Sequence, residues 1–521
     1  MAGRVSRSSS TLGRPASGEN RPFTMPTAMT MKQALLPRLV SHAAIIAMLL
    51  LAMALCLWLG AKQSDRPFER DDYDNFKMGY NLYRRGVISL ADERIPYPRP
   101  TDRREPLPAI ALAFYLKSAP GFTEYPSPAE ALSPNNLKIV KRFNLIWIFT
   151  TLVTTWLLCR RLTGSVTMAF MALFSVFYFL CFSRFYYNSL SPELLAATLL
   201  MTTSLALVSA VDRPRWRSFA MAGLLLGLLC LTKASFVYIS AGIVLTVGVM
   251  VLSRGGLRSL GLLGTFVLVA GVVVLPWMIR NYRHFGDFEI TQRAGEVLLV
   301  RAYKDQMTRD EFVGAFYVYS PSPVRAWLGP LMGFSPRDLQ PGGRLQRLVR
   351  FQPGDQEAVN RGDPTAAVSY YARMVANINV LRWQCRDAGD PDPYRCAGLG
   401  LKKKALALIR ADLPRHVVMS IPFMWRGIWC FNHLNSSFAA IANLLGFAMT
   451  LAMPIVALAK RRANLLIFVL PTLGSIAFHA LMTHYIWRYA IPTVPILIVS
   501  LVVGLQFGAY GSKKLLRSLV P

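Results

Sequence analysis

The chain has 521 residues, of which 53% are hydrophobic and 17% are charged, and its formal net charge is +30. So apolar a composition excludes an ordinary soluble protein of several domains. The charge does not indicate nucleic acid, because the basic residues are spread over short turns and two long loops and do not gather on one basic domain. Anionic membrane lipids and phosphate-bearing substrates are the expected partners.

Residues 1–38 are rich in Ser, Pro and Arg, contain Glu19 as their only acid, and show neither a helical nor a strand period. This composition predicts a disordered basic tail. The apolar run that follows is longer than the core of a signal peptide and has no convincing small-residue cleavage site. It is therefore expected to remain as an anchor in the membrane.

A helix needs about 20 predominantly apolar residues to cross roughly 30 Å of hydrocarbon, because lipid offers no partners to backbone polar groups. About ten segments of the chain meet this condition. They lie near 39–61, 143–159, 165–183, 193–211, 218–232, 235–252, 260–279, 438–459, 464–480 and 490–510. The sequence therefore predicts an all-α polytopic membrane protein.

The turns between spans indicate how the chain is oriented. Every second connection is short and basic, namely Arg160-Arg161, 213–217, 254–258, 460–462 and 513–517. The positive-inside rule places these turns and both termini in the cytoplasm. The chain then divides into the tail 1–38, a membrane module 39–279 with an outer loop 62–142, a large outer segment 280–437, and C-terminal membrane helices with a short cytoplasmic tail, 438–521.

The first outer loop opens with an aromatic stripe. Its members recur every three or four residues in ERDDYDNFKMGYNLYRRG and are Tyr73, Phe76, Tyr80 and Tyr83. This spacing predicts a helix lying in the membrane interface. Asp71 and Asp72 stand at its start, where two interpretations remain open. Either carboxylate can cap the helix, or it can act as a general base for an acceptor hydroxyl or amine at the membrane surface.

A second interfacial helix is predicted in RREPLPAIALAFYLK, where proline suits the first turn. Its expected apolar face is formed by Leu107, Ile110, Ala111 and Phe114. Arg103 and Arg104 then lie at the mouth of the bundle. Each of these arginines can be a functional cation or a side chain that reaches up to the head groups.

Three more cations stand at predicted outer ends of spans, against the positive-inside bias. Lys233 ends GLLLGLLCLTKAS, Arg280 follows VLPWMI, and Arg488 begins the last span. Ionisable residues in such places are costly and are functional candidates by default. A single one can be structural, but three on one face indicate a bound anion such as phosphate.

The large outer segment carries fewer signals. Cys385 and Cys396 flank the turn-rich RDAGDPDPYR on the side of the membrane where disulfides persist, and a bridge between them is plausible. The stretch KKKALALIRADLPRHVVMSIPFMWRGIW is typical of interfacial or re-entrant helix interrupted by Pro414 and Pro422. We expect this segment to help form an acceptor site.

Taken together, these features resemble the GT-C superfamily of glycosyltransferases that use polyprenyl-phosphate sugars. The likeness is to the bacterial branch with the lipopolysaccharide-core and lipid A glycosyltransferases, which is related to the protein O-mannosyltransferases. It is carried by DDYDNFKMGYNL with REPLP, FYYNSLSPELLAATLL, GLLLGLLCLTKAS, and PWMIRNYRHFGDF joined later by RYAIPTVP. These blocks extend from about residue 71 to residue 495 and so cover most of the chain.

The resemblance implies roles for particular residues. Asp71 matches the catalytic aspartate of the family, with Asp72 second. Arg104 takes the place of the basic residue that contacts the carrier phosphate, although Glu105 stands where the family has a proline. The resemblance likewise implies that Lys233, Arg280 and Arg488 bind the donor phosphate.

The mechanism implied is an inverting transfer from a polyprenyl-phosphate sugar to a lipid, glycan or protein acceptor on the periplasmic face of the inner membrane. No cofactor is implied. A divalent metal held by Asp71, Asp72 and Asp74 is an open alternative. An acidic cluster at the start of a helix more commonly caps that helix. The rival from another class is a lipid or sugar transporter or flippase, but the sequence shows no repeated halves with broken helices.

Overall fold

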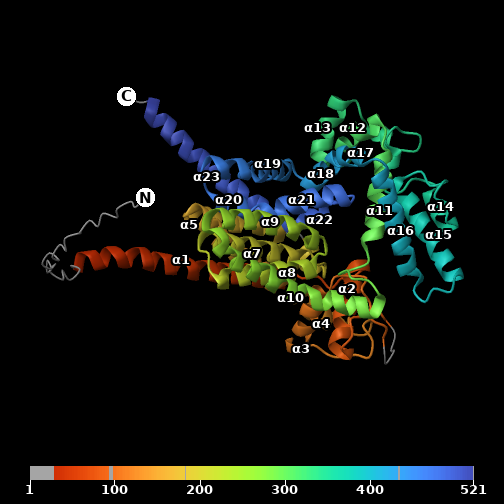
Figure 1. Ribbon diagram of the computed structural model, residues 1–521, viewed down its shortest axis with the longest axis horizontal. Helices are drawn as coiled ribbons and strands as arrows, with labels where there is room; N and C mark the ends of the chain where they lie inside the picture. The colour runs from red at the N-terminus through yellow and green to blue at the C-terminus, as the bar shows by residue number, and fades with distance from the viewer. Residues whose placement is uncertain (1–27, 93–97, 182–183, 432–433, 520–521) are drawn as a thin grey trace, which may run out of the picture. The chain divides into compact units, whose positions relative to one another are not determined.

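The computed structural model describes residues 28–92, 98–181, 184–431 and 434–519 (Figure 1). Of the disordered tail predicted over 1–38, residues 1–27 lie outside the described residues. Residues 28–38 belong to helix α1, Ala28–Ala61, which begins before the predicted span. The chain divides into two compact units, Met1–Ala47 and Met48–Pro521. The second unit contains the outer segments and all spans after the first.

The predicted membrane-spanning segments are confirmed as apolar helices at the expected positions along the chain. Eight helices in the described part of the chain are long and apolar enough to cross a membrane, and two shorter apolar helices, Val166–Cys181 and Trp216–Thr232, accompany them. Each of the ten predicted spans falls on one of these helices. The described residues form helices, turns and loops, without a strand.

The helices of the bundle have the following bounds: α4 Pro134–Thr163, α5 Val166–Val176, α6 Arg184–Asn188, α7 Glu193–Asp212, α8 Trp216–Thr232, α9 Ser235–Gly255, α10 Leu260–Phe285, α19 Ser437–Ala459, α20 Ala463–Ile467, α21 Leu470–Met482, α22 Trp487–Ala490 and α23 Val494–Leu519. Helix α8 packs against α7 and α10. At Gly223 of α8 a side chain would meet the carbonyl oxygen of Phe266 at 2.4 Å, so glycine allows the close approach of α10.

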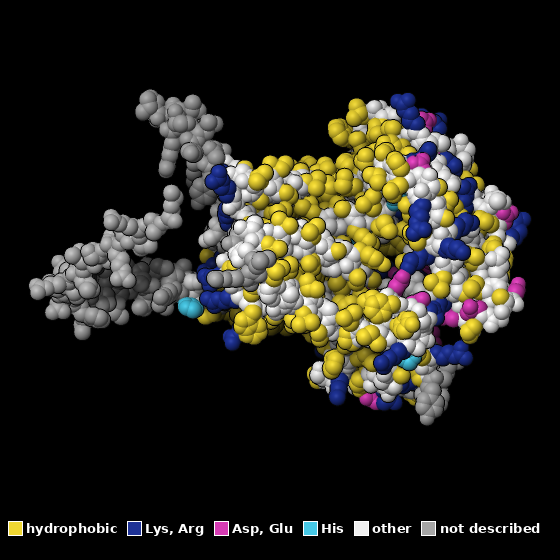
Figure 2. Space-filling model, viewed as in Figure 1, with side chains coloured by type: hydrophobic (Ala, Val, Ile, Leu, Met, Phe, Trp, Pro, Cys, Tyr) yellow, Lys and Arg dark blue, Asp and Glu magenta, His cyan; other side chains and the backbone are white. Residues whose placement is uncertain are grey.

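The outward-facing positions of the bundle are occupied by large apolar side chains. They include Leu245 and Val249 of α9, Leu268 and Val272 of α10, and Ile455 and Leu458 of α19. Figure 2 shows hydrophobic side chains gathered over the bundle, with Lys and Arg concentrated at its end and over the outer segment. Exposed apolar surface of this extent is what lipid contact requires.

The first outer loop contains α2, Arg70–Arg85, and α3, Pro106–Ser118. The aromatic stripe of α2 is not turned to the lipid, because Phe76 and Tyr80 are buried among residues of α3 and α4. Helix α3 buries Ala109, Leu112 and Leu116, while Phe114 of its predicted apolar face is 71% exposed. The loop is therefore a packed module with a small core of its own.

The large outer segment is helical throughout most of its length. It holds α11 Ala294–Tyr303, α12 Arg309–Val318, α13 Ser322–Met332, α14 Asp355–Arg361, α15 Tyr370–Asp387, α16 Pro393–Ala411, α17 Leu413–Val418 and α18 Ile421–Ile428. Pro414 and Pro422 stand in the first turns of α17 and α18, where a missing N–H costs nothing. The plausible bridge between Cys385 and Cys396 is present and joins α15 to α16.

The order of the helices brings distant residues together at one end of the bundle. Helix α7 begins at Glu193, α8 ends immediately before Lys233, and α22 begins immediately before Arg488. The start of α2 lies against these ends, since Asp71 contacts Arg488 and Asp72 contacts Ser189. Charged groups from four parts of the chain therefore meet at one place.

Candidate active site

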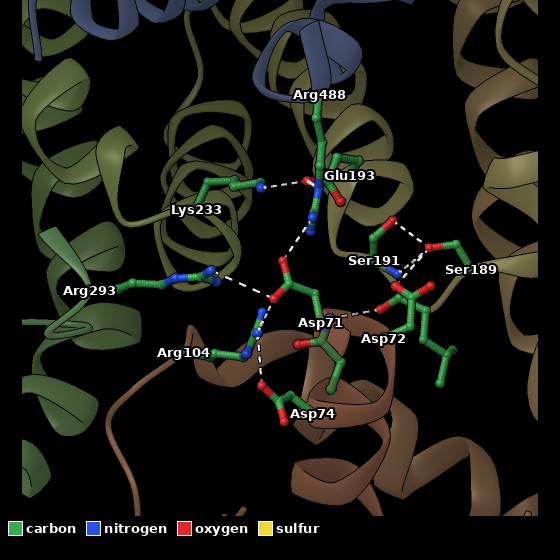
Figure 3. A network of polar contacts seen from close by, with 12 residues as sticks. Asp71, Asp72, Asp74, Arg104, Ser189, Ser191, Glu193, Lys233, Arg293 and Arg488 are labelled. Atoms are coloured by element: carbon green, nitrogen blue, oxygen red, sulfur yellow. Dashed lines mark hydrogen bonds and ion pairs between the residues drawn. The ribbon is translucent and has the colours of Figure 1, made fainter. Parts of the chain in front are cut away.

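Asp71 and Asp72 occupy the first turn of α2 and make their contacts outside it. Arg70, just before them, has φ 46°, a left-handed conformation that is uncommon for a residue with a side chain. The N-cap residue, Glu69, makes no side-chain cap. The hydrogen bonds made by the two aspartates go to arginine and serine side chains, and the carboxylates point apart (Figure 3).

Asp71 lies at the centre of a cationic group (Figure 3). Its Oδ1 is 2.5 Å from Nη2 of Arg104 and 3.6 Å from Nη2 of Arg293, and its Oδ2 is 2.8 Å from Nη1 of Arg488. The side chain of Arg104 is only 7% exposed and also pairs with Asp74 at 3.0 Å. Three arginines from separate segments thus converge on one carboxylate.

A second carboxylate, Glu193, lies deeper and is fully buried. Its Oε1 is 2.7 Å from Nε of Arg488 and 3.2 Å from Nζ of Lys233. Arg488 therefore bridges Asp71 and Glu193. One network of ion pairs therefore contains the predicted cations Arg104, Lys233 and Arg488, and Glu193 contacts the last two.

The charges in this network act on Asp71. Burial alone would raise the pKa of its carboxyl group. The positive charges of Arg104, Arg293 and Arg488 outweigh this effect and hold the pKa of Asp71 below its ordinary value. The Asp71 carboxylate is therefore ionised, and both of its oxygens lie next to guanidinium groups.

Asp72 has a different environment from its neighbour. Its Oδ1 accepts a hydrogen bond of 2.8 Å from the hydroxyl of Ser189, which also contacts Ser191. Burial raises the pKa of Asp72 to about 6, although the Ser189 hydrogen bond and the charge of Arg488 act in the opposite direction. The pKa of Asp71 therefore lies below that of Asp72, and such a difference is common in pairs of acid and base groups.

We expect Asp72→Asn to stabilise the protein at pH 7.5 and to have little effect near pH 4. The folded pKa of about 6 exceeds the ordinary 3.8, so the folded state keeps a proton that the unfolded state loses between these values. Wild-type stability therefore falls as pH rises through this window. The full difference is up to about 3 kcal/mol by the shift and less after solvent screening. Thermal unfolding of both proteins in detergent across this range measures it; a gap independent of pH contradicts it.

Arg280 is not part of the network. Its Nη1 donates to the carbonyl of Thr101 at 3.1 Å and to Asn281 at 2.8 Å, and its guanidinium lies over the ring of Trp277. These contacts tie the end of α10 to the first outer loop. Arg280 therefore lies outside the group around Asp71, and its assignment to the donor phosphate remains a prediction.

Sequence reasoning missed Glu193, Arg293 and Ser189. Glu193 stands at the outer end of a span, so the rule that selected Lys233 and Arg488 also applies to it. Arg293 and Ser189 lie in connecting segments whose composition carries no comparable signal. Only the packing of the segments brings them to Asp71 and Asp72.

The three aspartates of α2 are not arranged around one point. Arg104 lies between Asp71 and Asp74, while Asp72 points to Ser189 (Figure 3). Within the ranges that the structure describes, no group of three or more His, Cys, Asp or Glu side chains is placed to hold a metal ion. The cation already present between Asp71 and Asp74 is a guanidinium.

The site is suited to receiving an anion. The Nε of Arg104 is buried and has no hydrogen-bond partner in the described part of the chain. Arg104, Arg293 and Arg488 approach Asp71 from different directions, and guanidinium groups match the oxygens of a phosphate in the same way as those of a carboxylate. A phosphate arriving here would compete with Asp71 for its partners.

No family model matches the chain, and no curated protein matches it in sequence. Among solved structures it is similar to ArnT from Cupriavidus metallidurans bound to undecaprenyl phosphate, with 14% identity, a TM-score of 0.37, and coverage of 88% of this chain and 78% of ArnT. It is also similar to the arabinosyltransferase EmbB from Mycobacterium smegmatis, with 14% identity, a TM-score of 0.30, and coverage of 87% and 41%.

Proposed function

We propose that this multi-pass membrane protein is a glycosyltransferase. It moves a sugar from a polyprenyl-phosphate donor to a lipid, glycan or protein acceptor at the outer face of the membrane, with inversion at the anomeric carbon. Asp71 is the general base. Arg104, Lys233 and Arg488, joined by Arg293, bind the donor phosphate.

The observation that carries this proposal is the convergence of Arg104, Arg293 and Arg488 on the Asp71 carboxylate. Transfer from a phosphate-linked sugar needs a proton acceptor for the incoming nucleophile close to cations for the departing phosphate. These two requirements are met here within one hydrogen-bonded group of side chains. A transport pathway has no need of a base within a phosphate site.

Donor binding would also activate the base. When the donor phosphate takes over the guanidinium groups of Arg104, Arg293 and Arg488, Asp71 loses the charges that depress its pKa. Its proton affinity then rises towards the ordinary range, where a carboxylate accepts a proton more effectively. The carboxylate is thus held inactive until the leaving group is in place.

In the transfer step, one bond to the anomeric carbon forms as another breaks. The acceptor O–H or N–H gives its proton to Asp71 while its O or N atom attacks the anomeric carbon. The bond from that carbon to the phosphate oxygen breaks on the opposite face, and the polyprenyl phosphate leaves with the electron pair. Cations that are already in position stabilise this charge in the transition state, each by on the order of a few kcal/mol.

Sugar transfer by the purified full-length protein in detergent tests the proposal directly. A panel of polyprenyl-phosphate sugars is supplied with lipid, glycan and peptide acceptors, and products are detected by mass spectrometry. We expect transfer from at least one donor, with inverted anomeric configuration. Donor binding without transfer to any acceptor, combined with movement of the lipid across reconstituted vesicles, favours the transporter alternative instead.

The orientation is proposed from the basic turns and from the disulfide. A bridge between Cys385 and Cys396 suits an oxidising compartment, which supports an outer location for 280–437. With ten spans, both termini then lie in the cytoplasm. Reporter enzymes fused to each terminus should give the same cytoplasmic signal. Opposite signals from the two ends contradict the count, because one apolar helix then does not cross.

A further inference from the structure

The outer segment contains a second group of cations, which we define as Lys304, Arg350 and Arg426. In the described part of the chain no Asp or Glu oxygen lies within 4.0 Å of their nitrogens; their recorded hydrogen bonds go to the Tyr319 hydroxyl, the Tyr371 hydroxyl and the His484 carbonyl. Nearby Arg301, in contrast, is paired with Asp305 at 2.5 Å. Of the three, Lys304 is buried, and a buried charge is ordinarily paired with an opposite charge, which the described residues do not supply here.

Lys304 and Arg426 share the ring of Tyr319. The Nζ of Lys304 is 3.1 Å from the Tyr319 hydroxyl and lies over the ring of Phe423 at 5.2 Å. The guanidinium of Arg426 lies 4.4 Å from the centre of the Tyr319 ring. Lys304 is only 4% exposed. Contacts with aromatic rings offset part of the cost of burying a cation, but they do not neutralise its charge.

His484 completes the surroundings of this group. Burial, followed by the charges of Arg426, Lys304 and Arg350, holds the pKa of His484 well below its usual range. The ring is therefore neutral, and its Nδ1 is buried without a hydrogen-bond partner in the described residues. Burial and the charges of Arg426 and Arg301 likewise lower the pKa of Lys304. In both cases burial is the larger cause, and neighbouring positive charge adds to it.

The backbone at this place is strained. Tyr485 has φ 33° although it carries a large side chain, and it is fully buried. Its ring lies where a side chain on residue 427 would be, 2.1 Å from the position of such a Cβ, so Gly427 is required. Arg426 directly precedes Gly427 in the chain, so this packing also holds the His484 carbonyl against the Arg426 side chain. Strain of this kind persists only where the surrounding structure enforces it.

We propose that Lys304, Arg350 and Arg426 form a second anion site, which binds a phosphate or carboxylate group of the acceptor. The segment from His484 to Arg488 connects it with the first site, because the His484 carbonyl accepts a hydrogen bond from Arg426 and Arg488 contacts Asp71. The assignment to the acceptor rests on the proposed function, whereas the binding of an oxyanion does not. The other source of the same chemistry is the phosphate of the donor.

Binding of inorganic phosphate to the full-length protein in detergent tests the site. The measurement is made in an Arg104→Gln background, which weakens the first site, and reads the rise in unfolding temperature with phosphate. We expect Lys304→Met to abolish most of that rise while leaving the protein folded, since it removes an unbalanced buried charge. Arg350→Gln, at an exposed position, should reduce it as well. The control is Lys403→Met on the exposed face of α16. Equal protection in the Lys304 and control variants overturns the site.

Transfer kinetics then separate the two sources of the anion. With an acceptor that carries a phosphate or carboxylate, Lys304→Met should raise the acceptor KM roughly tenfold and leave the donor KM unchanged, since one charge-assisted contact is lost. The effect should vanish with a neutral acceptor analogue. A change in the donor KM instead overturns the assignment to the acceptor. If no transfer is found at all, the proposed function fails, while phosphate protection still decides whether the site exists.

Discussion

Replacing Asp71 with Asn is expected to lower the rate of sugar transfer by roughly two to four orders of magnitude, the usual contribution of a general base. The amide keeps the size of the side chain and one acceptor oxygen, which can bond to Arg104 or to Arg488 but not to both. It cannot accept the proton of the acceptor. Turnover with saturating donor, measured by product formation, reports the loss. Asp65→Asn is the matched control, because Asp65 is an exposed carboxylate on the same loop that pairs with Lys138.

The stability of this variant has to be measured beside its activity. Since Asp71 attracts three arginines, its loss should also cost on the order of 1 kcal/mol of folding free energy after solvent screening. An Asn variant that folds and transfers at the parent rate rejects Asp71 as the base and moves the assignment to Asp72. An unfolded Asn variant contradicts the modest cost expected here.

Replacing Glu193 with Gln is expected to have the largest effect on folding. Glu193 is fully buried and balances Lys233 and Arg488. Removing one partner of a buried ion pair leaves uncompensated charge and costs roughly 3–5 kcal/mol. The fall in unfolding temperature in detergent measures this loss.

The double variant Glu193→Gln with Lys233→Met separates folding from function. It removes one negative and one positive charge, so most of the lost stability should return, as a double-mutant cycle would show. Transfer should stay low, because Lys233 is assigned to the donor phosphate. A double variant no more stable than Glu193→Gln contradicts the pairing, and one that regains both stability and full transfer contradicts the role of Lys233.

The sequence by itself determined the membrane architecture. Hydropathy is a local property of about 20 residues, and every predicted span falls on an apolar helix of the structure. It also selected Lys233 and Arg488, because charge at the end of a span is costly wherever the helix packs. Arg104 was indicated by its place before the second predicted interfacial helix and by the family resemblance. The disulfide between Cys385 and Cys396 could be inferred as plausible from the sequence, because a short loop separates the two cysteines on the side of the membrane expected to be oxidising.

The tertiary structure alone decided which groups meet. Asp71 and Arg488 are 417 residues apart, and their ion pair depends on how α2 lies against the start of α22. The same packing brings in Glu193 and Arg293 and leaves Arg280 against Trp277. An apolar stripe shows that a helix face avoids water, but lipid and protein are equally apolar. For this reason periodicity did not reveal that the aromatic face of α2 is buried within the protein.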